Sequence, residues 1–362
     1  MKKSLIALAV LAASGAAMAQ SSVTLYGVAD AGVTYLNGAD NWSGVTSGNN
    51  LTSRLGFRGV EDLGGGLKAN FVIEGGFNLD NGDGASGYAG AKAGEGFQFK
   101  RQSTVGLAGN FGEVRLGREL TAAFNATARY DVFGSVGIGQ SRLWADGGVV
   151  DTVAPALNAN GNAVTTNQRI SNALTYVSPD FSGFKVGLNY GFGETTASNS
   201  DSGYMGAGLM YDNGPLSLGL GLERLNNGVN SVATSDIDAW SLGGSYDFGV
   251  AKLLAGYRES KVDRATGENK RNGYYVAATA PVGAGTVRVS YNRYENELAN
   301  VKDKADQFAV GYVYGLSKRT SVYGTYAYIK NKNGANLYTL GSGGLKTNGS
   351  QQGVQVGVSH AF

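Results

Sequence analysis

Near its middle the chain reads Leu216-Ser217-Leu218-Gly219-Leu220-Gly221-Leu222-Glu223, in which leucine alternates with small or polar residues. Successive side chains of a β-strand point to opposite faces, so this period of two predicts a strand with one apolar and one polar face. The same alternation recurs along the chain, most clearly around residues 23–34, 287–292, 308–314 and 354–359. We therefore expect an all-β protein.

The links between the expected strands have two lengths. Asp212-Asn213-Gly214-Pro215 and Pro281-Val282-Gly283-Ala284-Gly285 are tight turns, in which glycine supplies the positive φ that such turns need. Longer polar segments lie between them, for example residues 37–50, 79–96 and 331–351. Short turns on one side and long loops on the other are typical of an outer-membrane β-barrel.

The hairpins give the number of strands. They are expected to begin near Ser22, Leu67, Glu113, Phe184, Leu216, Ala251, Gly285 and Thr320. These hairpins correspond to about 16 antiparallel strands, an even number as in bacterial outer-membrane barrels. The length also fits about 18 strands. A barrel of about 16–18 strands encloses an aqueous channel, whereas about 8 strands fill their own interior.

The composition excludes several other classes of protein. Charged residues make up 16% of the chain and glycine 58 of its 362 residues, against about 25% and about 7% in ordinary soluble domains. Collagen is excluded because no G-X-Y period appears and the chain has only 4 prolines. Disorder is excluded because 42% of the residues are hydrophobic. Without cysteine the chain can form neither a disulfide nor a cysteine-based metal site.

The first 19 residues are predicted to be a cleaved signal peptide. Met1-Lys2-Lys3 is basic, an apolar run from Leu5 to Ala13 follows, and Ala17-Met18-Ala19 precedes the cleavage site before Gln20. The apolar run is shorter than the ~20 residues that a transmembrane helix needs. Removing the segment leaves 28 basic and 28 acidic residues, which gives no support to a nucleic-acid partner. Residues 20–362 then form one exported domain.

A soluble, secreted β-sandwich or β-solenoid would show the same alternation. Tyrosines gather near the expected strand ends, as at Tyr26, Tyr35, Tyr190, Tyr211 and Tyr246, which suits the two interfacial girdles of a membrane barrel. Closing the sheet into a barrel would also remove every exposed edge. Both observations favour a barrel in the cell outer membrane.

Six segments in order resemble the general porins of Gram-negative outer membranes, most closely their β-proteobacterial branch. They are Val23–Gly27, Ser53–Gly59, Glu61–Leu67, Val105–Leu107, Phe111–Arg118 and Val356–Phe362. The resemblance implies a 16-stranded barrel, a homotrimer, and passive diffusion of ions and small hydrophilic solutes. It also implies that the barrel assembly machinery reads the last strand through Phe362. Outer-membrane lipid and lipopolysaccharide are the expected surroundings, and no cofactor or metal is expected.

One connection, residues 119–168, lacks a strong period of two. Loops longer than about 15 residues are uncommon and usually functional. The resemblance implies that this third loop folds into the barrel as a constriction, with Asp131 preferred because Tyr130–Gly134 is similar to the family's acidic loop tip. The alternative is a solvated external loop. Further candidates on it are Phe133, Asp146 and Asp151.

Charged residues within strands are expected to face the lumen or to lie near a membrane interface. An arginine on the lipid face at mid-membrane costs about 2–4 kcal/mol. Arg54 and Arg58 alternate with apolar residues and are therefore predicted to point inward. The same reasoning points Glu74, Arg115 and Arg288 inward.

Two arginines are less clear from the pattern. Arg101 shares its parity with Phe97, Phe99 and Val105, which points it outward, whereas the resemblance places an arginine of this strand in the lumen. We adopt the lumen. Arg169 resembles the basic residue on the strand after the long loop, although its own parity is uncertain.

These residues suggest a channel with two charged walls. The expected basic wall consists of Arg54, Arg101 and Arg169 with Arg58 and Arg115, and the expected acidic wall of Glu74 and Asp131. A gap of roughly 10 Å is comparable with the Debye length of about 8 Å at physiological salt, so a transverse field would persist across it. Charge rings bias the ion type. Because the arginines outnumber the acids, we expect a general diffusion channel with mild anion preference.

Three other functions fit the sequence less well. A solute-specific channel for organic acids or other anions would need a ladder of basic residues, and the sequence shows scattered arginines instead. A membrane-embedded enzyme is disfavoured because the single histidine, His360, has no partner nearby in the sequence. A purely adhesive barrel would be expected to be smaller and plugged, or to carry an extra domain.

Overall fold

The computed structural model of the chain describes residues 22–84, 96–144, 168–193, 203–226, 236–262, 268–298, 301–335, 338–342, 344 and 346–362. The predicted signal peptide lies outside these residues, as do Asp146 and Asp151. Within them, no helix is long and apolar enough to cross a membrane.

The chain folds as a succession of antiparallel strands with a short helical segment after the sixth. The elements are β1 (Ser22–Asn37), β2 (Asn41–Ser47), β3 (Arg54–Gly64), β4 (Leu67–Gly76), β5 (Gln102–Gly109), β6 (Gly112–Leu120), α2 (Ala122–Thr127), the 3₁₀ turn η1 (Ala128–Tyr130), β7 (Arg169–Val177), β8 (Phe184–Gly191), β9 (Tyr204–Asn213), β10 (Leu216–Leu225), β11 (Ile237–Asp247), β12 (Lys252–Val262), β13 (Asn269–Val282), β14 (Gly285–Leu298), β15 (Val301–Gly315), β16 (Thr320–Lys332) and β17 (Ser350–Ala361).

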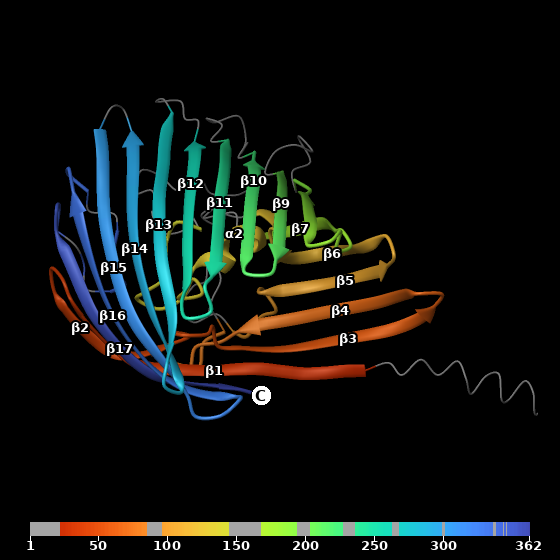
Figure 1. Cartoon of the computed structure of the whole chain (residues 1–362), viewed down its shortest axis with the longest axis horizontal. Coiled ribbons are helices and arrows are strands. Elements are labelled where there is room, and N and C mark those ends of the chain that lie inside the picture. Colours follow the sequence, from red (N-terminus) through yellow and green to blue (C-terminus); the bar gives the residue numbers. More distant parts are fainter. Residues whose placement is uncertain are drawn as a thin grey trace, which may run out of the picture.

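The strands close into a barrel. From β3 to β17 each strand pairs antiparallel with its neighbours in sequence, and β17 pairs with β1 over Val28–Asn37. The first half of β1, Ser22–Val28, pairs with β3, and its second half, Ala31–Asn37, pairs with β2. Because β2 and β3 together occupy one place in the ring, the 17-stranded sheet is a 16-stranded barrel. The prediction of 16 strands is confirmed, and the C-terminus lies beside β1 (Figure 1).

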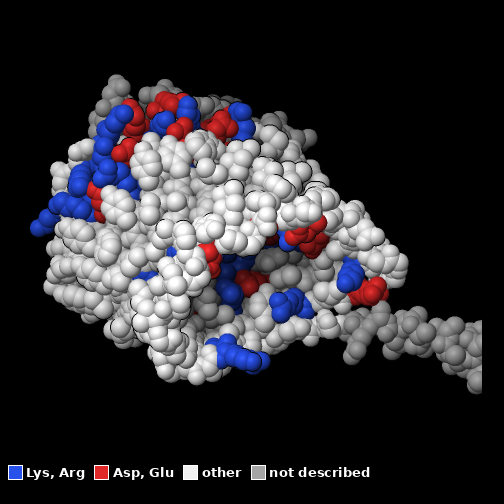
Figure 2. All heavy atoms as spheres, in the orientation of Figure 1, with Lys and Arg blue, Asp and Glu red and all other residues white. Residues whose placement is uncertain are grey.

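The alternation in the sequence separates an apolar outer face from an inner face of small and polar residues. On β10, Leu218 and Leu222 are exposed, whereas Gly219, Gly221 and Glu223 are buried. Such an uncharged outer belt is what a transmembrane barrel presents to lipid. Figure 2 shows a nearly uncharged band across the wall and charged side chains gathered over the upper strand ends.

The chain after β6 packs against the inner face of the barrel. Thr121 caps α2 through its side chain, and α2 then lies against β8–β11 (Figure 1). A Cβ added to Gly208 would lie 2.2 Å from the carbonyl oxygen of Ala122, and one added to Gly219 would lie 2.1 Å from that of Ala126. Glycine at these positions therefore allows the helix backbone to touch the wall.

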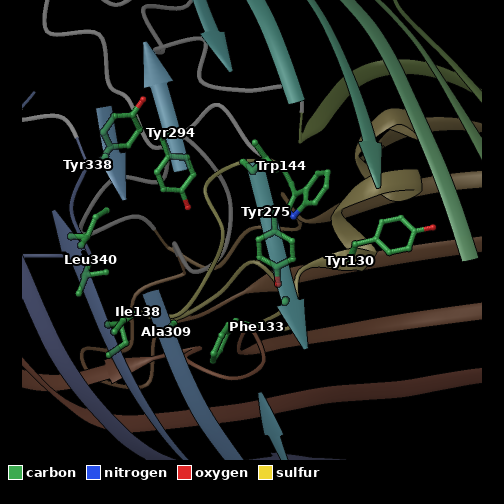
Figure 3. Close-up of a cluster of buried hydrophobic side chains, with 14 of the residues drawn as sticks. Tyr130, Phe133, Ile138, Trp144, Tyr275, Tyr294, Ala309, Tyr338 and Leu340 are labelled. Atoms are coloured by element: carbon green, nitrogen blue, oxygen red, sulfur yellow. The ribbon is translucent and has the colours of Figure 1, made fainter. Parts of the chain in front are cut away.

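An apolar cluster fills part of the barrel interior (Figure 3). The ring centroids of Tyr294 and Tyr338 lie 5.1 Å apart in a stacked pair, and Trp144 meets Tyr275 edge to face at 6.0 Å. Alanines on the inner wall of β13, β15 and β16 leave the space that these rings occupy. The cluster includes Leu36, Tyr130, Phe133, Ile138, Leu143, Trp144, Tyr275, Ala277, Tyr294, Ala309, Ala327, Ile329, Tyr338 and Leu340.

Candidate functional site

Arginine side chains from β3 and from the chain just before β5 meet at Glu74 on the inner wall. Arg101 Nε donates to Glu74 Oε1 at 2.7 Å, and Arg54 Nε lies 3.5 Å from Oε2. The Tyr26 hydroxyl donates to the same Oε2 at 3.1 Å. The Arg58 guanidinium lies over the Tyr26 ring, 5.1 Å from its centroid. Figure 2 shows basic side chains with acidic ones beside them in the hollow of this face.

The arginine cluster continues on β6 and β7. Arg169 Nε donates to the carbonyl oxygen of Arg101 at 3.0 Å, and Arg118 Nε donates to that of Lys100 at 2.6 Å. We use the term arginine cluster for Arg54, Arg58, Arg101, Arg118 and Arg169 together with Glu74.

The position of Arg101 has a local explanation. β5 begins at Gln102, and residues 96–100 carry no strand pairing. The period-two rule that pointed Arg101 outward therefore does not apply to it, and Arg101 is only 8% exposed. Outward parity does hold within the strand, where Val105 and Leu107 are exposed.

The expectation of an acidic wall needs correction at Glu74. Its carboxylate lies among the arginines and pairs with Arg101 and Arg54, rather than standing opposite them. Glu74 faces Gln102 across the β4–β5 ladder. This strand pairing brings Glu74 next to Arg101, the residue before Gln102. Glu74 therefore reduces the positive charge of the cluster instead of opposing it across a gap.

Asp131 also differs from its expected role. Its carboxylate accepts backbone N–H bonds from Phe133, Ser135 and Ser141 at 2.8–3.0 Å, and the Tyr275 hydroxyl donates to it at 3.4 Å. It is 6% exposed. Burial raises the pKa of the Asp131 carboxyl to about 6, and the backbone N–H groups oppose that shift. Asp131 thus folds the loop tip upon itself rather than presenting a charge to solvent.

Arg115 lies on the inner face of β6, and its charge is compensated locally. Its guanidinium donates to Glu113 Oε2 at 2.8 Å and to Glu119 Oε2 at 2.7 Å. Asn70 also donates to Glu113, at 2.9 Å. Two carboxylates therefore surround one arginine, which sets Arg115 apart from the arginine cluster.

Arg288 points inward and contacts the loop. Its guanidinium donates to the carbonyl oxygen of Val132 at 3.2 Å and to Asn50 Oδ1 at 2.9 Å. It also lies 4.8 Å from the centroid of the Phe133 ring. Arg288 and Phe133 therefore fasten the loop tip to β14.

The last strand meets the first through Phe362. Phe362 and Gly27 exchange two backbone hydrogen bonds, each of 3.1 Å. These bonds lie at the end of the β1–β17 seam that closes the barrel.

Sequence reasoning missed Arg118 of the arginine cluster and two further groups of residues. Asp30 is fully buried, and its carboxylate accepts hydrogen bonds from four donors. Glu223 and Arg258 form a buried ion pair at 2.5 Å on the wall beside α2. Asp30 and Glu223 both lie at polar positions of the alternating pattern of their strands, so the sequence could have predicted that they face inward. It could not have predicted their partners, which are far away in the sequence.

A closed barrel with an apolar belt and a charged interior defines a transmembrane channel protein of the bacterial outer membrane. The family model for Gram-negative porins matches residues 5–334. The chain is 45% identical to outer membrane porin protein 32 of Delftia acidovorans, over 100% of both chains. The structure is similar to that of an anion-selective porin from Comamonas acidovorans, with a TM-score of 0.79 and 41% identity over 95% and 100% of the two chains.

The trimer form of OmpT from Vibrio cholerae shares the fold, with a TM-score of 0.67 and 15% identity over 94% and 99% of the two chains. The chain belongs to the Gram-negative porin family. It is therefore an outer-membrane porin, a passive channel rather than an enzyme.

Proposed function

We propose that the protein is a general diffusion porin whose pore prefers anions mildly. The observation that carries this proposal is the arginine cluster on the wall formed by β3–β7, in which five arginines lie near a single carboxylate. Glu74 pairs with Arg54 and Arg101, whereas Arg58 lies over the Tyr26 ring and Arg118 and Arg169 donate to backbone carbonyl oxygens. Positive charge beside a low-dielectric wall raises the local concentration of anions. The relative from Comamonas acidovorans is described as anion-selective, which agrees with this sign.

We propose that residues 119–168 form the constriction. The described part of this connection contacts β8–β11 through α2, and β13, β14, β15 and β17 through residues 132–142. The arginine cluster comes from the other part of the wall. Solutes would then pass between the loop and the arginines, and the apolar cluster would keep water from the far side.

A homotrimer is the proposed assembly, supported by a related fold solved as a trimer. We further propose that residues 1–19 direct export and that Phe362 is read by the barrel assembly machinery. Ion pairs on the outer strand ends, such as Glu295–Lys304 and Glu297–Lys302, both 3.1 Å, would meet the lipid and lipopolysaccharide headgroups.

The test is single-channel current across a planar bilayer under a salt gradient. We expect three equal conductance steps and a reversal potential of anion sign. Arg54→Gln with Arg58→Gln should move that potential toward cations, because positive charge is lost while Glu74 stays paired with Arg101. Arg319→Gln, at a short turn between β15 and β16, is the matched control and should leave it unchanged.

A large current without selectivity in the parent protein would contradict the anion preference while keeping the porin. Absence of current would contradict the diffusion channel itself. Saturation of anion flux at low concentration would favour a solute-specific channel instead.

A further inference from the structure

Asp30 lies in β1 and contacts residues 48–53, the segment that links β2 to β3. Its Oδ1 accepts from Asn49 N and from the Tyr323 hydroxyl, both at 2.8 Å. Its Oδ2 accepts from Asn50 N at 3.2 Å and Leu51 N at 3.0 Å. Four donors suit an ionised carboxylate, which only accepts hydrogen bonds. Such charge-assisted bonds are about twice as strong as neutral ones.

The backbone of Asp30 binds the same segment. Its carbonyl oxygen accepts from Gly48 N at 2.8 Å and from Ser53 Oγ at 3.0 Å. Its own N–H donates to Ser53 Oγ at 3.1 Å. A single residue thus fixes both ends and the middle of residues 48–53, which otherwise carry no strand pairing.

The segment fixed in this way touches the tip of the loop. A Cβ added to Gly137 would lie 2.3 Å from the carbonyl oxygen of Asn49, so the two backbones are in direct contact. Gln355 bridges the same pair, since it donates to Asn49 Oδ1 at 2.8 Å and accepts from Ile138 N at 3.3 Å. Asn50 Oδ1 accepts from Arg288, which also holds the carbonyl oxygen of Val132.

We propose that Asp30 is a positioning residue of the pore, which sets where the loop tip 131–138 lies in the lumen by fixing Asn49 and Asn50. The inference rests on the proposed role of this loop as the constriction. Asp30 does not face the permeating ion, because it is fully buried. It acts through the two asparagines and Arg288, so its loss should change pore behaviour without removing a charge from the path.

The principal variant is Asp30→Asn, which keeps the shape but turns one acceptor oxygen into a donor facing backbone N–H groups. We expect brief closures and open-channel noise in single-channel records to rise at least twofold, with a shifted mean conductance. Asp62→Asn is the matched control, because Asp62 is exposed and accepts one backbone N–H, from Gly64, at 2.9 Å. The control should behave as the parent.

A second variant tests whether Asp30 acts through Asn50 and Arg288. Asn50→Ala removes the acceptor for Arg288 and should produce the same closures. If both residues act through one contact chain, the double variant should show no more closures than Asp30→Asn alone. If the double variant closes as often as the effects of the two single variants added together, Asp30 does not act through Asn50. If both single variants close as rarely as the parent protein, the inference is overturned.

Folding is checked from the mobility of unheated protein on a denaturing gel. If Asp30→Asn does not fold, Tyr323→Phe removes one donor to the same carboxylate and takes its place beside Asn50→Ala. A role in stability alone would lower the unfolding temperature and leave conductance and noise unchanged, which also overturns the inference. Failure of the proposed function is distinct, because the parent protein would then carry no current.

Discussion

Gly219→Ala tests whether helix α2 rests directly on the inner wall. The added Cβ would lie 2.1 Å from the carbonyl oxygen of Ala126, whereas an ordinary contact begins at 3.4 Å. The obstacle is backbone, which cannot rotate away as the end of a long side chain can. The helix must therefore move about 1.3 Å from the wall, the difference between these two distances.

The displacement should be visible in two measurements. Overpacking of this kind costs about 1–3 kcal/mol, so the folded protein should unfold at a lower temperature. Because the helix can move only toward the lumen, single-channel conductance should fall. Gly324→Ala is the matched control, since its new Cβ would meet Val356 at an ordinary 3.7 Å. Parental conductance and unfolding temperature in Gly219→Ala would refute direct contact between α2 and the wall.

Three other perturbations have expected outcomes. Glu223→Gln leaves Arg258 buried without its carboxylate, which should cost about 3–5 kcal/mol of stability in chemical unfolding; an unchanged midpoint would contradict it. Folding raises the pKa of the Asp131 carboxyl from 3.8 to about 6, so the folded state binds the proton more tightly than the unfolded state, and stability should fall as pH rises through this window. In Asp131→Asn the unfolding temperature should therefore depend less on pH between pH 4 and about 7. The same pH dependence in the variant as in the parent protein would count against this reasoning. Deleting Phe362 removes its two hydrogen bonds to Gly27, so the yield of folded barrel in the outer membrane should drop, and normal yield would exclude a role in assembly.

The fold was predictable because one physical rule governs most of the chain. A strand between lipid and water must alternate, and the leucines at 218 and 222 face outward as that rule requires. The rule fails where the backbone leaves the ladder. Arg101 precedes β5 and turns inward against its parity. Periodicity cannot report such a departure, because the residues before the strand look like part of it.

Charge partners were harder to predict than charge orientation. Parity placed Glu74 inside, yet its partner Arg101 depends on the register between β4 and β5. Asp131 was expected to face the pore because Tyr130–Gly134 is similar to the acidic loop tip of the porin family. The turn that follows supplies three backbone N–H groups, and these replace water. An alternation pattern contains neither the register of distant strands nor the local path of an irregular loop.

The high glycine content has a second cause besides turns. Gly208 and Gly219 face the lumen on strands β9 and β10, where a methyl group would collide with the backbone of α2. Gly256 likewise gives room to Trp144, whose ring would lie 2.0 Å from an added Cβ. These glycines weaken their strands slightly, since glycine in a strand interior has no side chain to pack. The closed hydrogen-bond ring of the barrel tolerates that loss, and on this side α2, rather than side chains of the wall, covers the inner face of β9 and β10. Under the constriction proposed above, ions pass the arginines on β3–β7, so the glycines on β9 and β10 would help to determine which charges a passing ion meets.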